Sequence, residues 1–199
     1  MNLEISVKVV GFNQTNCWML KSQSSCILID PGARPKILWQ WLQEQKVKLD
    51  LMLFTHSHLD HIGGAYYLQK KTRAPCRLHP LELENRWKWL GFSRAKFTPI
   101  QEGEIISFAG AEIQVLHTPG HSPGSVCYYF DQYLFCGDLL FAGGVGRWDM
   151  PGGSFRKLVH SLKEKLRQFP DSVQVFPGHG PATTLGAERR INPLLGKYE

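Results

Sequence analysis

The segment Thr55–Gly64 reads T-H-S-H-L-D-H-I-G-G and follows the apolar run Leu51–Phe54. Imidazole nitrogens and carboxylate oxygens are ligands of zinc and of other first-row metals. A helix cannot aim residues i and i+2 at one ion, because neighbours on its surface are three or four residues apart. Side chains of an extended segment repeat every second residue. We therefore expect His56 and His58 to point together from a strand end.

The next two polar residues, Asp60 and His61, fall where the chain is expected to turn from the strand into a helix. The four side chains then form two pairs, His56 with His58 and Asp60 with His61. Two such pairs could supply the first ligands of two adjacent metal sites. A single histidine near a strand end is usually a hydrogen-bonded surface or core residue. Four ligand-type side chains this close together seldom are, so the segment predicts a metal centre.

The pattern H-x-H-x-D-H resembles the signature of the metallo-β-lactamase fold superfamily. The segment Leu116–Ser125 (L-H-T-P-G-H-S-P-G-S) resembles the second motif of that superfamily, in which the histidine after T-P-G is a metal ligand. In this chain that residue is His121. The segment Cys136–Phe141 (C-G-D-L-L-F) resembles the third motif, and the aspartate that bridges two metal ions there corresponds to Asp138.

The segment Phe176–Pro181 (F-P-G-H-G-P) resembles the last motif, whose metal ligand corresponds to His179. After His61, the three later ligands come at intervals of 60, 17 and 41 residues. Four motifs in the order of the superfamily make the resemblance specific, and it extends along nearly the whole chain.

The resemblance implies a centre with two divalent metal ions. One ion would be held by His56, His58 and His121, the second by Asp60, His61 and His179, and both by Asp138. These ligand types suit zinc, which we expect first, and also iron or manganese. A hydroxide bound to the ions would be the nucleophile, so Asp60 and Asp138 are the candidate catalytic residues, Asp60 by orienting that hydroxide.

The periodicity of apolar and turn residues predicts a mixed α and β domain. Strands are expected at 4–10, 17–21, 26–29, 51–55, 75–78, 104–108, 112–117, 126–130, 133–136 and 173–176, and helices at 35–45, 62–71, 81–90, 154–169 and 184–190. The four-layer αββα sandwich of the metallo-β-lactamase fold, an α/β (α+β) architecture, is implied by the resemblance.

The length of 199 residues suits one domain, which we expect to span 1–199. The sequence has neither an apolar run of the length that crosses a membrane nor a signal-peptide pattern at its start, so a cytoplasmic location is expected. Its five cysteines are scattered without a C-x-x-C pair. Neither a disulfide framework nor a cysteine zinc site is therefore expected.

The formal net charge of +6 and the isoelectric point of about 9.1 suggest an anionic partner. Lysine and arginine are spread along the chain rather than gathered on one segment. Attraction of a small anionic substrate is therefore expected rather than binding to nucleic acid or to a membrane. A homodimer is common in such folds, but the sequence shows no clear interface pattern.

Within the superfamily, the chain most resembles the hydroxyacylglutathione hydrolases (glyoxalase II) of the short bacterial type. That family hydrolyses S-D-lactoylglutathione and related thioesters. The segment Phe141–Gly153 (F-A-G-G-V-G-R-W-D-M-P-G-G) resembles the family segment that lines the substrate pocket. Arg147 is therefore a candidate for binding a substrate carboxylate. A structural salt bridge between Arg147 and Asp149 is an equal alternative.

Two features keep a second activity open. Only 20 residues follow His179, so the C-terminal helical domain with which larger glyoxalase II enzymes bind glutathione is not expected. The G-R-x-D of Gly146–Asp149 also occurs in mononuclear-iron glutathione persulfide dioxygenases of the superfamily. The last motif reads G-H-G at Gly178–Gly180 rather than the A-H-D typical of those dioxygenases, which favours the hydrolase. Lactonase, β-lactamase and nucleic-acid-processing activities are less favoured.

Overall fold

The computed structural model describes residues 3–85 and 94–196. Within these ranges the first sheet has its strands in chain order. They are β1 (Glu4–Val10), β2 (Thr15–Lys21), β3 (Ser25–Ile29), β4 (Lys48–Leu53), β5 (Cys76–Leu78) and β6 (Phe97–Pro99). Strands β1 to β3 are antiparallel, and β3 to β6 are parallel.

The second sheet has the strand order β14-β13-β10-β9-β8-β7. Its strands are β7 (Ile105–Phe108), β8 (Ala111–His117), β9 (Val126–Phe130), β10 (Tyr133–Gly137), β13 (Gln174–Pro177) and β14 (Thr183–Thr184). Strands β10 and β13 are parallel and the other neighbours are antiparallel. A separate hairpin joins β11 (Leu140–Phe141) to β12 (Gly144–Val145).

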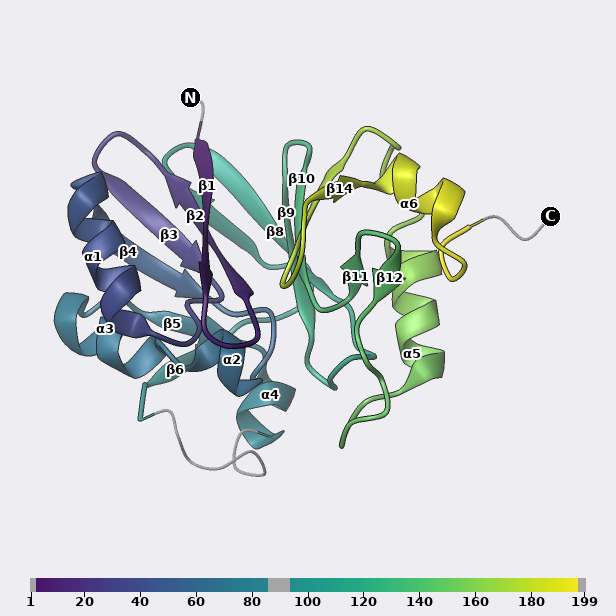
Figure 1. Ribbon diagram of the computed structural model, residues 1–199, viewed down its shortest axis with the longest axis horizontal. Coiled ribbons are helices and arrows are strands. Elements are labelled where there is room, and N and C mark those ends of the chain that lie inside the picture. The colour runs from purple at the N-terminus through teal and green to yellow at the C-terminus, as the bar shows by residue number, and fades with distance from the viewer. Residues whose placement is uncertain (1–2, 86–93, 197–199) are drawn as a thin grey trace.

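Helices lie on the two outer faces of these sheets (Figure 1). The first half of the chain contributes α1 (Pro35–Gln45), α2 (Leu59–Ile62), α3 (Ala65–Thr72) and α4 (Pro80–Asn85). The second half contributes α5 (Phe155–His160), the π-helical turn η1 (Ser161–Lys165) and α6 (Leu185–Ile191). In the described ranges, no helix combines the length and the apolar character needed to cross a membrane.

Three apolar layers hold the sheets and helices together. The middle layer lies between the two sheets, where Trp18 of β2 meets Phe176 of β13 with ring centroids 4.6 Å apart. A second layer packs α1 and α3 against the first sheet, and a third packs α5, η1 and α6 against the second sheet. The four-layer αββα sandwich is therefore confirmed.

Several element boundaries differ from those predicted. The predicted helix 62–71 is divided, because Gly64 N–H donates to the Pro31 carbonyl and a new helix begins at Ala65. The predicted helix 154–169 gives way to the π-helical turn after His160. The short strands β6, β11, β12 and β14 were not predicted, because two or three residues carry no periodicity. The predicted helix 81–90 is described only as far as Asn85, and its remainder lies outside the described residues.

Helix α5 packs directly on the loop that carries His121. Ser161 Oγ donates to the Pro119 carbonyl at 2.7 Å, and Ser154 N–H donates to the Gly120 carbonyl at 2.8 Å. Gly120 has φ +149°, and a Cβ there would lie 2.3 Å from the Leu158 Cα. Only glycine allows the helix to approach this loop so closely.

We predict that Gly120→Ala lowers the free energy of unfolding by about 3 kcal/mol, since overpacking against a backbone adds to conformational strain. Gly103→Ala is the matched control. Gly103 also has positive φ (+76°), but a Cβ added there would meet no heavy atom within 4 Å, so the substitution should cost about 1 kcal/mol. Urea denaturation of both metal-free variants measures the difference. Equal losses would show that contact with Leu158 is not the cause.

Candidate metal centre

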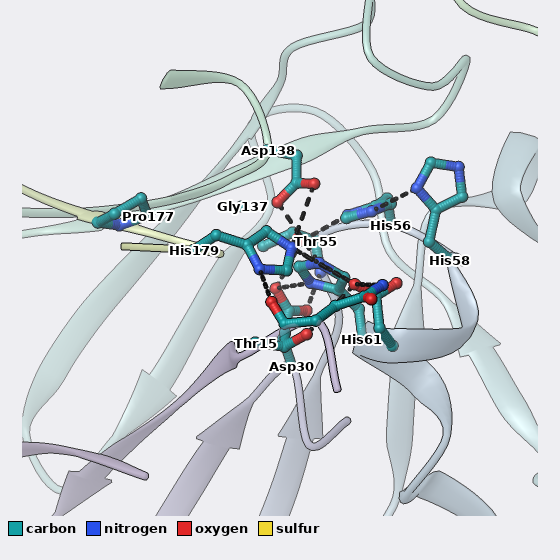
Figure 2. A network of polar contacts seen from close by, with 12 residues as sticks. Thr15, Asp30, Thr55, His56, His58, His61, Gly137, Asp138, Pro177 and His179 are labelled. Carbon is teal, nitrogen blue, oxygen red and sulfur yellow. Dashed lines mark hydrogen bonds and ion pairs between the residues drawn. The ribbon is translucent and has the colours of Figure 1, made fainter. Parts of the chain in front are cut away.

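All seven predicted ligands lie at one end of the sandwich, in segments that follow strands. His56 and His58 come after β4, Asp60 and His61 lie in α2, and His121 lies between β8 and β9. Asp138 is the first residue after β10, and His179 is the second residue after β13. Strands β10 and β13 are parallel neighbours and therefore end at the same edge of their sheet. Figure 2 shows side chains from these distant segments turned toward one another.

The first cluster consists of His56, His58 and His121, whose facing nitrogens lie within 4.8 Å of one another. His58 Nδ1 lies 3.0 Å from His56 Nε2 and 2.9 Å from His121 Nε2. The two Nε2 atoms are 3.2 Å apart. As predicted for an extended segment, His56 and His58 point together, although β4 ends at Leu53 and both lie in the loop that follows.

The second cluster consists of Asp60, His61 and His179. His179 Nε2 lies 3.3 Å from His61 Nε2 and 3.4 Å from Asp60 Oδ2. Asp60 Oδ2 also accepts hydrogen bonds of 3.2 Å from Asn13 Nδ2 and from Thr15 Oγ1, which fix the carboxylate from the side of the β1–β2 hairpin.

Asp138 lies between the two clusters. Its Oδ1 is 3.4 Å from His61 Nε2, and its Oδ2 is 3.5 Å from His121 Nε2 and 3.6 Å from His179 Nε2. Oδ1 is buried and forms no hydrogen bond with the described residues. A buried carboxylate oxygen of this kind is costly unless a cation neutralises it. The residues present therefore fit a metal centre, with Asp138 between its two clusters.

The second nitrogen of three histidines is held by a hydrogen bond directed away from the clusters. His61 Nδ1 contacts Asp30 Oδ2 at 2.9 Å, His121 Nδ1 contacts the Arg147 carbonyl at 2.7 Å, and His179 Nδ1 contacts the Asn13 carbonyl at 2.9 Å. Since these oxygens only accept, each Nδ1 carries the proton. Nε2 of each ring then faces into its cluster, where it can serve as a metal ligand once it carries no proton.

Asp30 orients the ring of His56 in the same way, through Thr55. Its carboxylate is 1% exposed and accepts from Thr55 N–H and Thr55 Oγ1, both at 2.7 Å. Because the Thr55 hydroxyl gives its one proton to Asp30, it accepts the contact of 3.0 Å from His56 Nδ1. Asp30 therefore orients both His56 and His61, a role that was not predicted from the sequence. Its only signal there was an acidic residue directly after an apolar strand, in the turn D-P-G.

His61 differs from His56 and His58 in the direction of its pKa shift. Burial, followed by repulsion from neighbouring imidazoles, lowers the pKa of His56 and brings the pKa of His58 to about 4. Both rings are thus neutral near pH 7. Burial also acts to lower the pKa of His61, but the carboxylates of Asp138, Asp30 and Asp60 outweigh it and raise the pKa to about 9. The negative charge around His61 favours a bound cation.

A cavity of about 600 Å³ opens beside both clusters. Its walls combine polar site residues with the apolar side chains of Leu59, Phe141, Val145 and Met150. Arg147 also lines the cavity, and its guanidinium forms a two-pronged ion pair with Asp149 at 2.9 and 3.0 Å. Arg147 thus lines the cavity and also forms the ion pair with Asp149. Binding of a substrate carboxylate by Arg147 stays a prediction.

Comparisons with known proteins agree with this geometry. The family model described as the metallo-beta-lactamase superfamily matches residues 10–179. The chain is 37% identical to an uncharacterized protein of Aquifex aeolicus, over 97% of each chain. It is 34% identical to the hydroxyacylglutathione hydrolase GloC of Haemophilus influenzae, over 98% of each chain.

Solved structures give the same result. The B3 metallo-beta-lactamase BLEG-1 is 32% identical with a TM-score of 0.88, covering 98% of this chain and 100% of its own. TTHA1623 in a di-iron-bound form is 38% identical with a TM-score of 0.83, covering 96% and 100%. ETHE1 from Myxococcus xanthus is 28% identical with a TM-score of 0.84, covering 98% and 85%. By fold, by family model and by near full-length relatives, this chain belongs to the metallo-β-lactamase superfamily.

Proposed function

We propose that this chain is a metal-dependent thioesterase that hydrolyses S-D-lactoylglutathione or related hydroxyacyl thioesters. The observation that carries the proposal is the convergence of seven ligand-type side chains beside a cavity of about 600 Å³, with Asp138 between two clusters. Five of the seven line the cavity: His58, Asp60, His121, Asp138 and His179. The names of two relatives support the choice of substrate. They are GloC and the hydroxyacylglutathione hydrolase of Klebsiella pneumoniae, which is 32% identical over 90% of this chain and 66% of its own length.

The proposed metal ligands are those predicted from the motifs. His56, His58 and His121 would hold one divalent ion, Asp60, His61 and His179 a second, and Asp138 would contact both. When bound, such ions supply a water that is deprotonated near neutral pH and a Lewis acid that polarises the thioester carbonyl. Zinc is the first metal to test, with iron and manganese next, since nitrogen and oxygen ligands suit all three.

The chain itself would orient the attacking water. Asp60 Oδ2 is fixed by Asn13 and Thr15, and Asp60 also lines the cavity. Burial acts to raise the pKa of Asp60, but the hydrogen bond from His179 and the charge of His61 outweigh it and lower the pKa. Asp60 therefore stays an anionic acceptor, able to take a hydrogen bond from the water and to aim its lone pair at the carbonyl.

The cavity would bind the substrate through both apolar and charged side chains. Phe141, Val145 and Met150 present apolar surface to the aliphatic parts of the thioester. Arg147 also lines the cavity, and its guanidinium would bind a substrate carboxylate through two parallel hydrogen bonds. For that contact, the guanidinium must either leave Asp149 or share its donors with it.

The mononuclear-iron glutathione persulfide dioxygenase remains the second candidate. The segment Gly146–Asp149 and the structural similarity to ETHE1 favour it. A single iron held by two histidines and one aspartate would need only part of the seven-residue set. The convergence of the whole set around Asp138 is why we prefer the hydrolase.

We predict that the purified protein contains about two metal ions and hydrolyses S-D-lactoylglutathione, and that removal of the metals by a chelator abolishes turnover.

Asp138→Asn should lower kcat at least about 100-fold, because the neutral amide of asparagine cannot act as an anionic ligand. Metal analysis and the loss of thioester absorbance measure these effects, and circular dichroism confirms that the variant is folded. A wild type that leaves the thioester intact but consumes oxygen with glutathione persulfide would establish the dioxygenase instead.

We predict that Arg147→Ala raises KM for a thioester with a carboxylate about tenfold while kcat changes little, because a charge-assisted contact to bound substrate is lost. Asp149→Ala is the control, since it removes the ion pair but leaves the guanidinium free. It should leave KM unchanged or lower it. If both variants raise KM equally, the Arg147–Asp149 pair acts by shaping the loop and not by binding substrate.

A further inference from the structure

Helix α4 contributes a buried carboxylate that is not among the seven predicted ligands. Glu82 is 1% exposed. Its Oε2 accepts from Ser57 N–H at 2.9 Å and from Ser57 Oγ at 2.5 Å. Its Oε1 accepts from Ser122 Oγ at 2.6 Å and from Gly124 N–H at 2.8 Å. Each carboxylate oxygen thus takes two hydrogen bonds, and the two oxygens serve different loops.

The two loops are those that carry the three-histidine cluster. Ser57 lies between His56 and His58, in the segment after β4 of the first sheet. Ser122 directly follows His121, in the connection between β8 and β9 of the second sheet. Glu82 therefore joins, through one side chain, the segments from opposite sheets whose histidines must meet.

The fit around Glu82 is close and chemically specific. A Cβ on Gly124 would lie 2.8 Å from Glu82 Cγ, so this loop approaches as near as a residue without a side chain allows. A carboxylate can accept all four hydrogen bonds. A glutamine of the same shape cannot, because its amide NH₂ would face one backbone N–H and one serine hydroxyl. The hydroxyl can turn to accept from the NH₂, but the backbone N–H is left buried without a partner.

The cluster itself needs such support. Hydrogen bonds of the outer nitrogens direct the Nε2 atoms of His56 and His121 toward each other at 3.2 Å. His58 Nδ1 faces the same point, 3.0 Å from His56 Nε2 and 2.9 Å from His121 Nε2, so three ligand atoms from two loops must be held at a fixed separation. A bond that holds both loops keeps the ligands near the geometry that a metal requires.

We infer that Glu82 is a positioning residue for the metal ion held by His56, His58 and His121. This inference rests on the metal centre proposed above and deepens it. Glu82 would not touch the ion or the substrate, and would act through Ser57 and Ser122 by fixing the distance between the two ligand loops.

Glu188 of α6 offers a matched control for the loss of a buried carboxylate. It is 0% exposed and accepts from Gly143 N–H at 2.9 Å, Thr183 Oγ1 at 2.7 Å and Asn192 Nδ2 at 3.1 Å. None of these three donors adjoins a proposed ligand in the sequence. Changing Glu188 to glutamine therefore imposes a similar penalty on folding without disturbing the ligand loops.

The test compares Glu82→Gln, Glu188→Gln and wild type, each stripped of metal and titrated with Zn²⁺ against a chromophoric chelator. We expect Glu82→Gln to weaken one of two zinc affinities by about 10- to 100-fold and to leave the other close to wild type. Glu188→Gln should retain both affinities. Wild-type affinities in Glu82→Gln, or an equal loss in Glu188→Gln, would overturn the inference.

A second variant covers the case in which Glu82→Gln does not fold. The double variant Ser57→Ala, Ser122→Ala keeps the carboxylate and its two backbone donors but removes both hydroxyl donors, and should weaken the same zinc site about tenfold. Unchanged affinities there would also overturn the inference. Since substrate is absent from the titration, a wild type that binds two zinc ions without hydrolysing thioesters would overturn only the proposed reaction, while the glutamine comparison still decides the role of Glu82.

Discussion

The constraint on which the site depends is that imidazole nitrogens must face one another across a few ångströms. His56, His61, His121 and His179 each have their Nδ1 held by an outward hydrogen bond, which leaves Nε2 pointing inward. The outward partners belong to separate parts of the fold: a threonine hydroxyl, an aspartate and two backbone carbonyls. The fold thus fixes the direction of each ring before a cation is bound, through contacts that belong to the surrounding sandwich.

The sandwich can hold these rings in place because several of its strands end at the same edge. Because β10 and β13 are parallel, Asp138 and His179 lie at the same edge of the second sheet. The apolar layer between the sheets fixes the position of that edge relative to β4. The β1–β2 hairpin then closes the end of the sandwich, where Asn16 N–H donates to the Gly178 carbonyl at 2.7 Å and Trp18 Nε1 donates to the Pro177 carbonyl at 3.0 Å. Ligands are therefore placed in loops, but each loop begins at a rigid strand.

The sequence predicted the parts of this site that carry chemistry in a short pattern, and missed those that act through isolated contacts. His56 to His61 stand out because four ligand-type residues are adjacent, and the main strands stand out by their periodicity. Asp30 and Glu82 are single acidic residues in a turn and a helix, which is where solvated carboxylates usually occur. Only the fold buries them. Asn13 contacts His179 with its backbone carbonyl, so its side-chain identity carried no signal for that contact.

The carboxylates around the site also relate it to the charge of the whole molecule. The chain has a formal net charge of +6, yet it gathers Asp30, Asp60, Asp138 and Glu82 at one end of the sandwich. In the described ranges, the ion pairs of the three aspartates are with imidazoles rather than with lysine or arginine. Buried anions that lack such partners are retained where cations neutralise them. The two divalent ions that we propose would balance four carboxylates and leave Arg147 and the basic surface to attract an anionic substrate.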